Sequence, residues 1–243
     1  MNLADRISNW IKEKVQEAKA EGVVMGLSGG VDSSVAVCLA KRAMGEKVLG
    51  LIMPCYSSVL DEDYVWLIAK RLNIKTERIS LDSIYNDLLG ILPSHKKIAL
   101  ANLKPRLRML TLYYFANNLN YLVVGTGNKS ELLIGYFTKY GDGGCDILPL
   151  GDLFKTEVRK LAKELKIPDE IVKRVPSAGL WERQTDEEEI GITYEDLDRT
   201  ILAIESGNKE SIPPQMLTKV EELIRKSAHK RFPVPVFKIV NGS

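Results

Sequence analysis

The stretch GVVMGLSGGVDSSVAVCLA, residues 22–40, joins an apolar run to a glycine turn and the first turns of a helical pattern. The run VVMGL has the length and the branched composition of a buried β-strand. Ser28, Gly29 and Gly30 follow it directly, and the helical pattern continues until Gly45 ends it. A strand, a glycine turn and a helix start form an arrangement in which several backbone N–H groups face an anion. The stretch therefore predicts a phosphate-binding turn.

Two known phosphate motifs do not fit this turn. The Walker A loop G-x-x-x-x-G-K-[ST] needs a lysine that is absent here, and G-x-G-x-x-G fails because Ser28 stands at its second glycine. An ordinary glycine-rich turn, in which Asp32 or Ser33 caps the helix, remains an alternative.

Asp32 favours the phosphate interpretation. A carboxylate that points into a phosphate site is repelled unless a divalent cation lies between them. Mg²⁺ commonly takes one or two protein carboxylates together with phosphate oxygens. The turn therefore predicts a nucleoside triphosphate bound with Mg²⁺. Glu131 follows another predicted strand and could complete the magnesium site, although by itself it is also compatible with a solvated loop.

The rest of the chain alternates between predicted strands and helices. Further strands are predicted at residues 47–54, 74–81 and 121–126, and helices at 3–20, 32–44, 61–73 and about 95–118. This alternation is typical of an α/β protein with a doubly wound, mostly parallel sheet and helices on both faces. Residues 125–151 show little amphipathic order, and a helical C-terminal part follows. Because no linker separates these regions, we expect residues 1–243 to form a single domain.

Composition places the chain among ordinary globular proteins. Its 243 residues are 45% hydrophobic and 27% charged, and 34 basic against 32 acidic residues give a net charge of +2. That balance provides no global basic field for nucleic acid. The amphipathic N-terminus does not resemble a signal peptide, and no apolar run reaches the roughly 20 residues that cross a bilayer. Three cysteines without C-x-x-C spacing favour a reducing compartment, so we expect a cytoplasmic protein with no membrane partner.

The hexapeptide SGGVDS, residues 28–33, resembles the SGGxDS loop with which N-type ATP pyrophosphatases grip the pyrophosphate leaving ATP. Four further blocks resemble the ammonia-dependent NAD synthetases of that superfamily, and they keep the family's order over nearly the whole chain. They are NLKPRLRM (102–109), GTGNKSELLIGYFTKYGDGGCDILPLGDLFKTEVRKLA (125–162), PSAGLWERQTDEEEIGITYEDLD (176–198) and SAHKRFPVP (227–235). The resemblance implies a Rossmann-like fold of the adenine nucleotide alpha hydrolase type.

The resemblance also implies an ATP site and a magnesium site. Mg²⁺ would be held by Asp32 and Glu131. Without the resemblance, Lys155 would be taken for surface charge. The implied ATP-binding residues are Gly26, Leu27, Ser28, Gly29, Gly30, Val31, Asp32, Ser33, Thr126, Lys155 and Ser177.

The second substrate that the resemblance implies is deamido-NAD. Taken alone, His229 and Lys230 are better explained as helix-surface residues. Tyr136 and Phe137 could stack on a ring or pack in the core, and Arg108 is a further candidate without an assigned role. The implied contacts with deamido-NAD are Arg106, Lys139, Asp146, His229 and Lys230.

The reaction that the resemblance implies has two steps. The pyridine carboxylate attacks the α-phosphorus of ATP, which gives an adenylate and pyrophosphate, and ammonia then displaces AMP to form NAD. No enzyme nucleophile is needed, in keeping with the lack of a Ser-His-Asp or Cys-His pattern. Since no glutaminase pattern accompanies these blocks, we expect free ammonia as the nitrogen source, unless a separate subunit delivers it. Family members are typically homodimers, and we expect the same here.

Two other classes of protein would contain the same turn. One is a tRNA-modifying ATP pyrophosphatase, for which neither a basic patch nor catalytic cysteines are evident. The other is a non-catalytic adenine-nucleotide sensor, which would not need Asp32 together with Glu131. Residues 85–94 and 180–189 are polar or punctuated by glycine and proline, and we expect them to be loops that become ordered when substrates bind.

Overall fold

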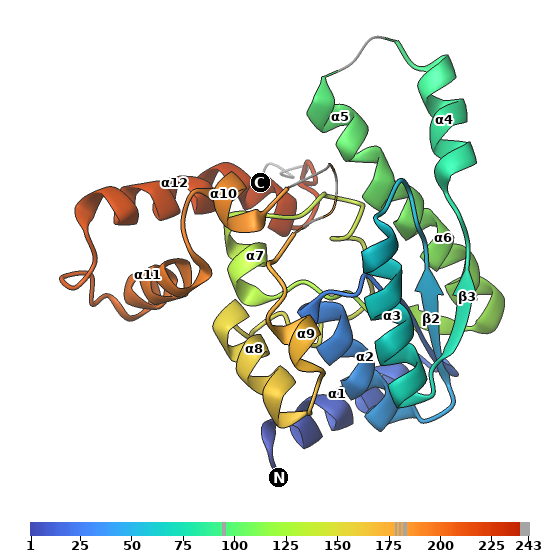
Figure 1. Cartoon of the computed structure of the whole chain (residues 1–243). Helices are drawn as coiled ribbons and strands as arrows, with labels where there is room; N and C mark the ends of the chain where they lie inside the picture. The colour runs from blue at the N-terminus through green and yellow to red at the C-terminus, as the bar shows by residue number, and fades with distance from the viewer. Residues whose placement is uncertain (94–95, 178, 180, 182–183, 239–243) are drawn as a thin grey trace, which may run out of the picture.

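A parallel β-sheet forms the centre of the molecule (Figure 1). The computed structural model describes residues 1–93, 96–177, 179, 181 and 184–238, and within them the strands follow the order β3-β2-β1-β4. Val24 pairs with Leu49 on one side and with Val123 on the other, so β1 lies inside the sheet. The strands are β1 (Gly22–Gly26), β2 (Val48–Ile52), β3 (Lys75–Arg78) and β4 (Tyr121–Val123).

Helices cover both faces of this sheet, and the expected α/β fold is confirmed. One face carries α1 (Leu3–Glu17), α2 (Val31–Met44), α3 (Val59–Leu72), α8 (Lys155–Glu164) and the short α9 (Asp169–Val172). The other carries α4 (Asp82–Ile91) and α6 (Leu103–Leu119), with α5 (Lys97–Ala101) just before α6. The helical C-terminal part is α10 (Asp186–Ile190), α11 (Tyr194–Ser206) and α12 (Pro214–Arg231), which pack with α7 (Lys129–Ile134).

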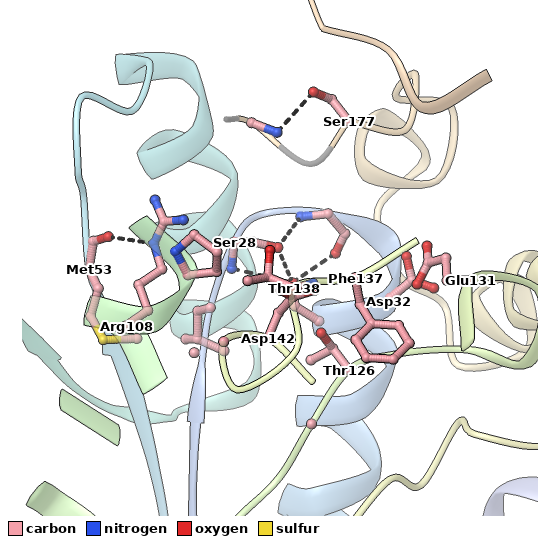
Figure 2. Close-up of a pocket in the computed structure, with 18 of the residues that line it drawn as sticks. Ser28, Asp32, Met53, Arg108, Thr126, Glu131, Phe137, Thr138, Asp142 and Ser177 are labelled. Atoms are coloured by element: carbon pink, nitrogen blue, oxygen red, sulfur yellow. Dashed lines mark hydrogen bonds between the residues drawn. The ribbon is translucent and has the colours of Figure 1, made fainter. Parts of the chain in front are cut away.

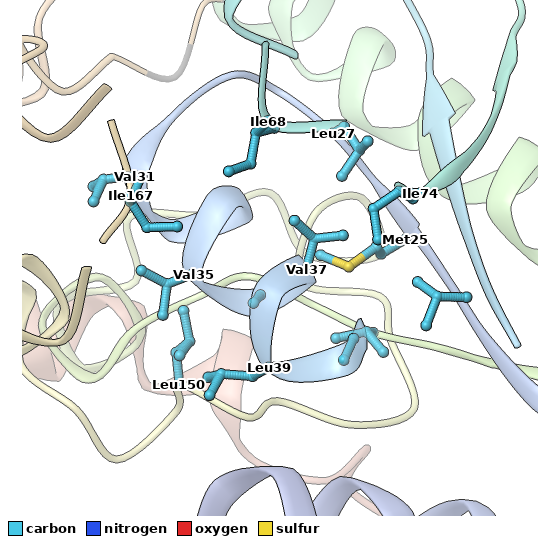
Figure 3. Packing of buried hydrophobic residues seen from close by; sticks show 14 of the residues in the cluster. Met25, Leu27, Val31, Val35, Val37, Leu39, Ile68, Ile74, Leu150 and Ile167 are labelled. Atoms are coloured by element: carbon cyan, nitrogen blue, oxygen red, sulfur yellow. The ribbon is translucent and has the colours of Figure 1, made fainter. Parts of the chain in front are cut away.

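Alternate residues of the central strands pack into two separate apolar cores. Val23 and Met25 belong to the core that contains α2, whereas Val24 belongs to the core that contains α6. Successive strand residues point to opposite faces, which explains why the run VVM is apolar throughout. In the first core, Val35 and Leu39 of α2 are fully buried (Figure 3). Because α2 is held so firmly, the glycine turn before it has a fixed position.

A third apolar core joins the C-terminal helices to the edge of the sheet. Ile134 of α7 packs with Tyr194 and Leu197 of α11 and with Val220 of α12, all of them buried. Since α7 follows the end of β4, this core brings distant parts of the chain to the edge where β1 and β4 end (Figure 1).

The expected continuous helix over residues 95–118 is wrong in detail. α5 ends at Ala101, and α6 begins at Leu103 after the cap residue Asn102. Residue 95 lies outside the described residues. The strands are also shorter than expected, because pairing within β4 stops at Val123 and Val124 makes a single bridge to Ile147.

The expected loop at residues 85–94 is also corrected, since α4 runs to Ile91. Leu81 and Tyr85 are buried and Leu88 packs beside them, at spacings of four and three that place the three side chains on one helix face. Gly90 ends no helix here, although it suggested a loop. Residue 94 lies outside the described residues.

The expected loop at residues 180–189 and the irregular stretch at 125–151 both contain helices. α10 begins at Asp186, and residues 180 and 182–183 lie outside the described part. α7 begins after Asn128, whose side chain accepts the N–H of Glu131 while the Glu131 side chain accepts the N–H of Asn128. No helix of the described residues has the length and apolar character needed to span a bilayer.

Candidate functional site

The glycine turn between β1 and α2 is closed by hydroxyl groups. The Ser28 and Ser33 hydroxyl oxygens lie 3.0 Å apart, and the Gly30 N–H donates to Ser28 Oγ over 3.3 Å. Ser33 and Ser34 both donate to the Gly30 carbonyl. Gly30 is the N-cap of α2 and makes no side-chain cap hydrogen bond, so the alternative in which Asp32 or Ser33 caps the helix is wrong. The N–H groups at the start of α2 therefore have no side-chain cap and lie near the carboxyl end of β1.

Gly29 has the conformation and surroundings that exclude a side chain. Its φ of +72° lies in the left-handed region. A Cβ atom there would lie 2.6 Å from the Asp61 carbonyl oxygen and 3.0 Å from the Cβ of Tyr64. The turn thus packs directly against the first residues of α3.

Two carboxylates and one ammonium meet beside this turn. Lys155 Nζ lies 2.5 Å from Asp32 Oδ2 and 3.0 Å from Glu131 Oε1. The Asn128 side-chain amide donates to the other oxygen of Asp32 over 2.9 Å, and the Tyr194 hydroxyl donates to Glu131 over 3.2 Å. We call Asp32, Glu131 and Lys155 the charged triad.

The three members of the charged triad come from three helix starts. Asp32 lies in the first turn of α2 and Glu131 in the first turn of α7, where the Asn128 capping box fixes its backbone. Lys155 is the first residue of α8, and its N–H donates to Ser130 Oγ over 2.9 Å. Carboxylates are stabilised at helix N-termini. The backbone of each member is therefore fixed by a helix start, and the Lys155 side chain reaches from there to both carboxylates.

Burial perturbs the charged triad strongly. Loss of water raises the pKa of Glu131 to about 7, with the Asp32 charge adding to the rise and Lys155 opposing it. Burial alone would lower the pKa of Lys155, but Asp32 and Glu131 outweigh it and raise that pKa above its ordinary value. Lys155 therefore stays protonated, while Glu131 titrates near neutral pH.

Asp32 and Glu131 together fit a divalent cation. The Lys155 ammonium between them demonstrates that a positive charge has room at this position. Two carboxylates completed by phosphate oxygens and water would suit Mg²⁺. In the described part of the chain, no group of three or more His, Cys, Asp or Glu side chains is arranged to hold a metal. A cation here would accordingly need ligands from a bound nucleotide.

A cavity of about 470 Å³ opens over the turn and the charged triad. Figure 2 shows Asp32 and Glu131 together on one side, Arg108 beside Met53 on the other, and Ser28 between them. The expected site residues that line the cavity are Gly26, Leu27, Ser28, Gly30, Val31, Asp32, Ser33, Thr126, Glu131, Lys155, Ser177 and Lys230.

The remaining expected residues do not line this cavity. Gly29 lies behind it, packed on α3. Arg106, Lys139 and His229 form a row in which Arg106 and His229 are exposed and Lys139 is half-buried. Arg106 donates to the Lys139 carbonyl over 3.4 Å, and Lys139 Nζ donates to the His229 carbonyl over 2.6 Å. Lys230, next in sequence, connects this row to the cavity, and its Nζ donates to the carbonyl oxygens of Gly135 and Phe137.

Asp146 supports the sheet in this structure. One of its oxygens accepts the Val123 N–H over 2.7 Å and the other accepts the Tyr113 hydroxyl over 2.9 Å. Its carboxylate thereby holds the loop at residue 146 against Val123, the last residue of β4. It is exposed but does not line the cavity.

Several residues in or beside the cavity were missed or left without a role. Arg108, noted from the sequence alone, donates from Nε to the Met53 carbonyl over 3.1 Å, and burial lowers its pKa. Asp186, which was missed, accepts the hydroxyls of Tyr136 and Tyr194. Asn128, which contacts Asp32, could have been found from its N-x-x-E spacing, because that spacing marks a capping box.

Comparison with known proteins identifies the family. The model of the family described as NAD synthase matches residues 3–234. The NH(3)-dependent NAD(+) synthetase of Carboxydothermus hydrogenoformans is 50% identical over 232 residues, covering 93% of this chain and 93% of that protein. The structure of NMN synthetase from Francisella tularensis matches with a TM-score of 0.90 at 36% identity over 98% of both chains. The NH3-dependent NAD synthetase from Campylobacter jejuni in complex with the nitrate ion matches with a TM-score of 0.86 at 30% identity, over 98% of this chain and 100% of that one. The chain therefore belongs to the NAD synthase family.

Proposed function

We propose that this protein is an ammonia-dependent NAD synthetase, which amidates deamido-NAD with ATP and ammonia and releases AMP and pyrophosphate. The observation that carries this proposal is the charged triad beside a glycine turn, in a chain 50% identical to a protein named NH(3)-dependent NAD(+) synthetase. The same reaction is the last step in making NAD.

The turn and the charged triad would act on the triphosphate of ATP. The N–H groups of residues 28–33 would bind the β- and γ-phosphates, with Thr126 and Ser177 as further donors from the cavity wall. Lys155 would move from its carboxylate partners toward the phosphates and stabilise the charge that develops on the leaving pyrophosphate. Asp32 and Glu131 would hold Mg²⁺, which when bound neutralises phosphate charge and polarises the phosphorus for attack.

The acid substrate would lie across the cavity toward α12. Lys230 lines the cavity, and the row of Arg106, Lys139 and His229 continues from it. We assign these residues and Asp146 to deamido-NAD, whose pyrophosphate and hydroxyls suit cations and a carboxylate. The protein would orient the pyridine carboxylate in line with the α-phosphorus and then admit ammonia to the adenylate.

A second candidate substrate is the corresponding mononucleotide. It is favoured by the similarity to the Francisella tularensis protein named NMN synthetase, which has a higher TM-score and identity than the Campylobacter jejuni NAD synthetase. Comparison of kcat/KM for deamido-NAD and nicotinic acid mononucleotide separates the two. We expect the dinucleotide to be preferred, and a clear preference for the mononucleotide would replace the first proposal with the second.

The decisive assay combines ATP, Mg²⁺, an acid substrate and ammonium, and measures NAD, AMP and pyrophosphate. We expect equal amounts of the three products and no glutamine use by the isolated chain. Adenylation without amide formation would contradict the proposal, and so would ATP turnover that depends on tRNA in place of the acid dinucleotide.

We further propose that the protein acts in the cytoplasm as a homodimer of single catalytic domains, with Mg²⁺ as its metal. Leu110 and Tyr114 of α6 are 65% and 66% exposed, which suits burial against a second copy. The three cysteines are free, as is usual in a reducing compartment. Light scattering coupled to size-exclusion chromatography would give the mass of a dimer, and a monomeric mass at micromolar concentration would contradict the assembly.

A further inference from the structure

Arg174 lies directly against the phosphate turn. Its Nη1 donates to the Gly29 carbonyl over 3.4 Å, and its Nη2 is paired with the Asp61 carboxylate. The guanidinium also lies 5.3 Å from the centre of the Tyr64 ring. Arg174 follows α9, whereas Asp61 and Tyr64 belong to the first turns of α3, so three distant parts of the chain meet at one guanidinium.

We propose that Arg174 binds the pyrophosphate that leaves ATP, and that Asp61 is its counter-ion while the turn is empty. This inference rests on the proposed function. Arg174 and Asp61 both line the same cavity as the turn and the charged triad.

The contacts of Arg174 permit an exchange of partners. The side chains of Arg174 and Asp61 are 26% and 24% exposed, so water screens their attraction. A phosphate carries more charge than a carboxylate and accepts the planar guanidinium fork through two parallel hydrogen bonds. A pyrophosphate in the turn would therefore compete well for a guanidinium that already touches Gly29.

The charge distribution in the site gives Arg174 a function that Lys155 does not cover. Lys155 contacts both Asp32 and Glu131 and so approaches the turn from the side where the cation would lie. Arg174 approaches from the side of α3 and Gly29. Two cations on different sides of the turn, together with its N–H groups, would surround a highly charged leaving group.

Arg174 also connects the turn to a further part of the cavity wall. Residues 175–177 follow it and line the cavity, and among them Ser177 is expected to contact ATP. A guanidinium that turns toward pyrophosphate would carry these residues toward the nucleotide. Departure of pyrophosphate would return Arg174 to Asp61.

The test uses two variants of one ion pair. Calorimetric titration of the full-length protein with inorganic pyrophosphate and Mg²⁺ gives the dissociation constant for each. We expect Arg174→Gln to weaken binding by about 10- to 100-fold, the usual effect of losing hydrogen bonds to a charged group. Asp61→Asn should keep wild-type affinity or bind severalfold more tightly, because it frees the guanidinium.

A purely structural role of the pair predicts a different pattern. Both substitutions break the same pair, so both would weaken pyrophosphate binding to a similar degree, and that result would overturn the inference. Unchanged binding by Arg174→Gln would overturn it too. Arg174→Lys keeps the charge but not the planar guanidinium, so its pyrophosphate affinity should fall between those of wild type and Arg174→Gln. This intermediate affinity would not be expected if the effect of Arg174→Gln came from a folding defect.

Arg78→Gln is the matched control. Arg78 pairs with Glu62, the neighbour of Asp61, over 2.8 Å, but Arg78 does not line the cavity. Its loss should leave pyrophosphate affinity unchanged. The NAD assay is separate from these titrations: a wild type that makes no NAD but binds pyrophosphate through Arg174 would overturn the proposed function alone. A wild type that makes NAD, with unaltered binding by Arg174→Gln, would overturn this inference alone.

Discussion

The two ends of the site are held in place differently. The ATP end, or buried end, is the charged triad beside the glycine turn. The dinucleotide end, or exposed end, is the set of residues assigned to deamido-NAD. Asp32, Glu131 and Lys155 lie at helix starts, where Lys155 is buried at 2% exposed and the two carboxylate side chains are each 16% exposed. Arg106 and His229 are exposed, and their row is linked through backbone carbonyls. If the proposed assignments are right, we expect the ATP end to be formed before ligands arrive and the dinucleotide end to gain order when the substrate binds.

The largest effect is expected at the buried end. Asp32→Ala should lower ATP-dependent pyrophosphate release by at least about 100-fold, because it removes a magnesium ligand and leaves Lys155 with one carboxylate partner. The measurement is pyrophosphate release with saturating deamido-NAD. His229→Ala at saturating substrate is the control from the exposed end, and near-normal release by Asp32→Ala would remove the distinction between the two ends.

The next effect concerns the rigidity of the turn. Gly29→Ala should destabilise the protein by about 1–3 kcal/mol, because an alanine is strained at positive φ and its Cβ would collide with the Asp61 carbonyl. Thermal unfolding measures this. Gly30 has φ −84°, so Gly30→Ala should cost about 1 kcal/mol or less. Equal melting temperatures for the two variants would mean that the turn is less tightly packed than described.

A smaller effect is expected at the exposed end. Arg106→Ala and His229→Ala should each raise KM for deamido-NAD by about 2- to 10-fold, the effect of one ordinary hydrogen bond. KM for ATP should stay the same in both. Steady-state kinetics, with each substrate varied in turn, measure both KM values. A rise in KM for ATP alone would mean that these residues belong to the other end.

The smallest expected effect concerns Cys145 in the wall of the cavity. Cys145 lines the cavity, and burial, with the Asp146 charge adding to it, raises the pKa of its thiol to about 11. At pH 8 only about one molecule in 1000 would carry the thiolate, against roughly one in four for an ordinary thiol. Alkylation of Cys145 by iodoacetamide, followed by mass spectrometry, should therefore accelerate up to about pH 11. A rate that levels off near pH 9 would mean that water reaches this wall.

The buried end could be predicted from the sequence better than the exposed end. Asp32 and Glu131 were identified because strand ends of a parallel sheet meet at one edge and because carboxylates near phosphate require a cation. That Lys155 bridges them could not be predicted, since it depends on how α8 packs against α2. The arginine on the turn was missed for the same reason, as Arg174 and Asp61 are separated by 113 residues.

Two predictions about helices were wrong for reasons that lie within the segments themselves. Gly90 suggested a loop, but the apolar spacing of Leu81, Tyr85 and Leu88 prevailed and α4 formed. The break at Asn102 does carry a signal, because Pro105 lies in the first turn of α6, where a helix tolerates a proline. The assignment of Asp146 to deamido-NAD stays a prediction, but its contacts with Val123 and Tyr113 could not be predicted, because they arise from the course of the loop after β4.

The central claim is that the turn holds the β- and γ-phosphates as a leaving pair, so that the bond between the α- and β-phosphorus atoms breaks. Phosphorus NMR of a reaction containing ATP, Mg²⁺, deamido-NAD and ammonium tests it directly. The account predicts AMP and pyrophosphate in equal amounts with NAD, and the loss of all three with Asp32→Ala. ADP and inorganic phosphate as the products would contradict it.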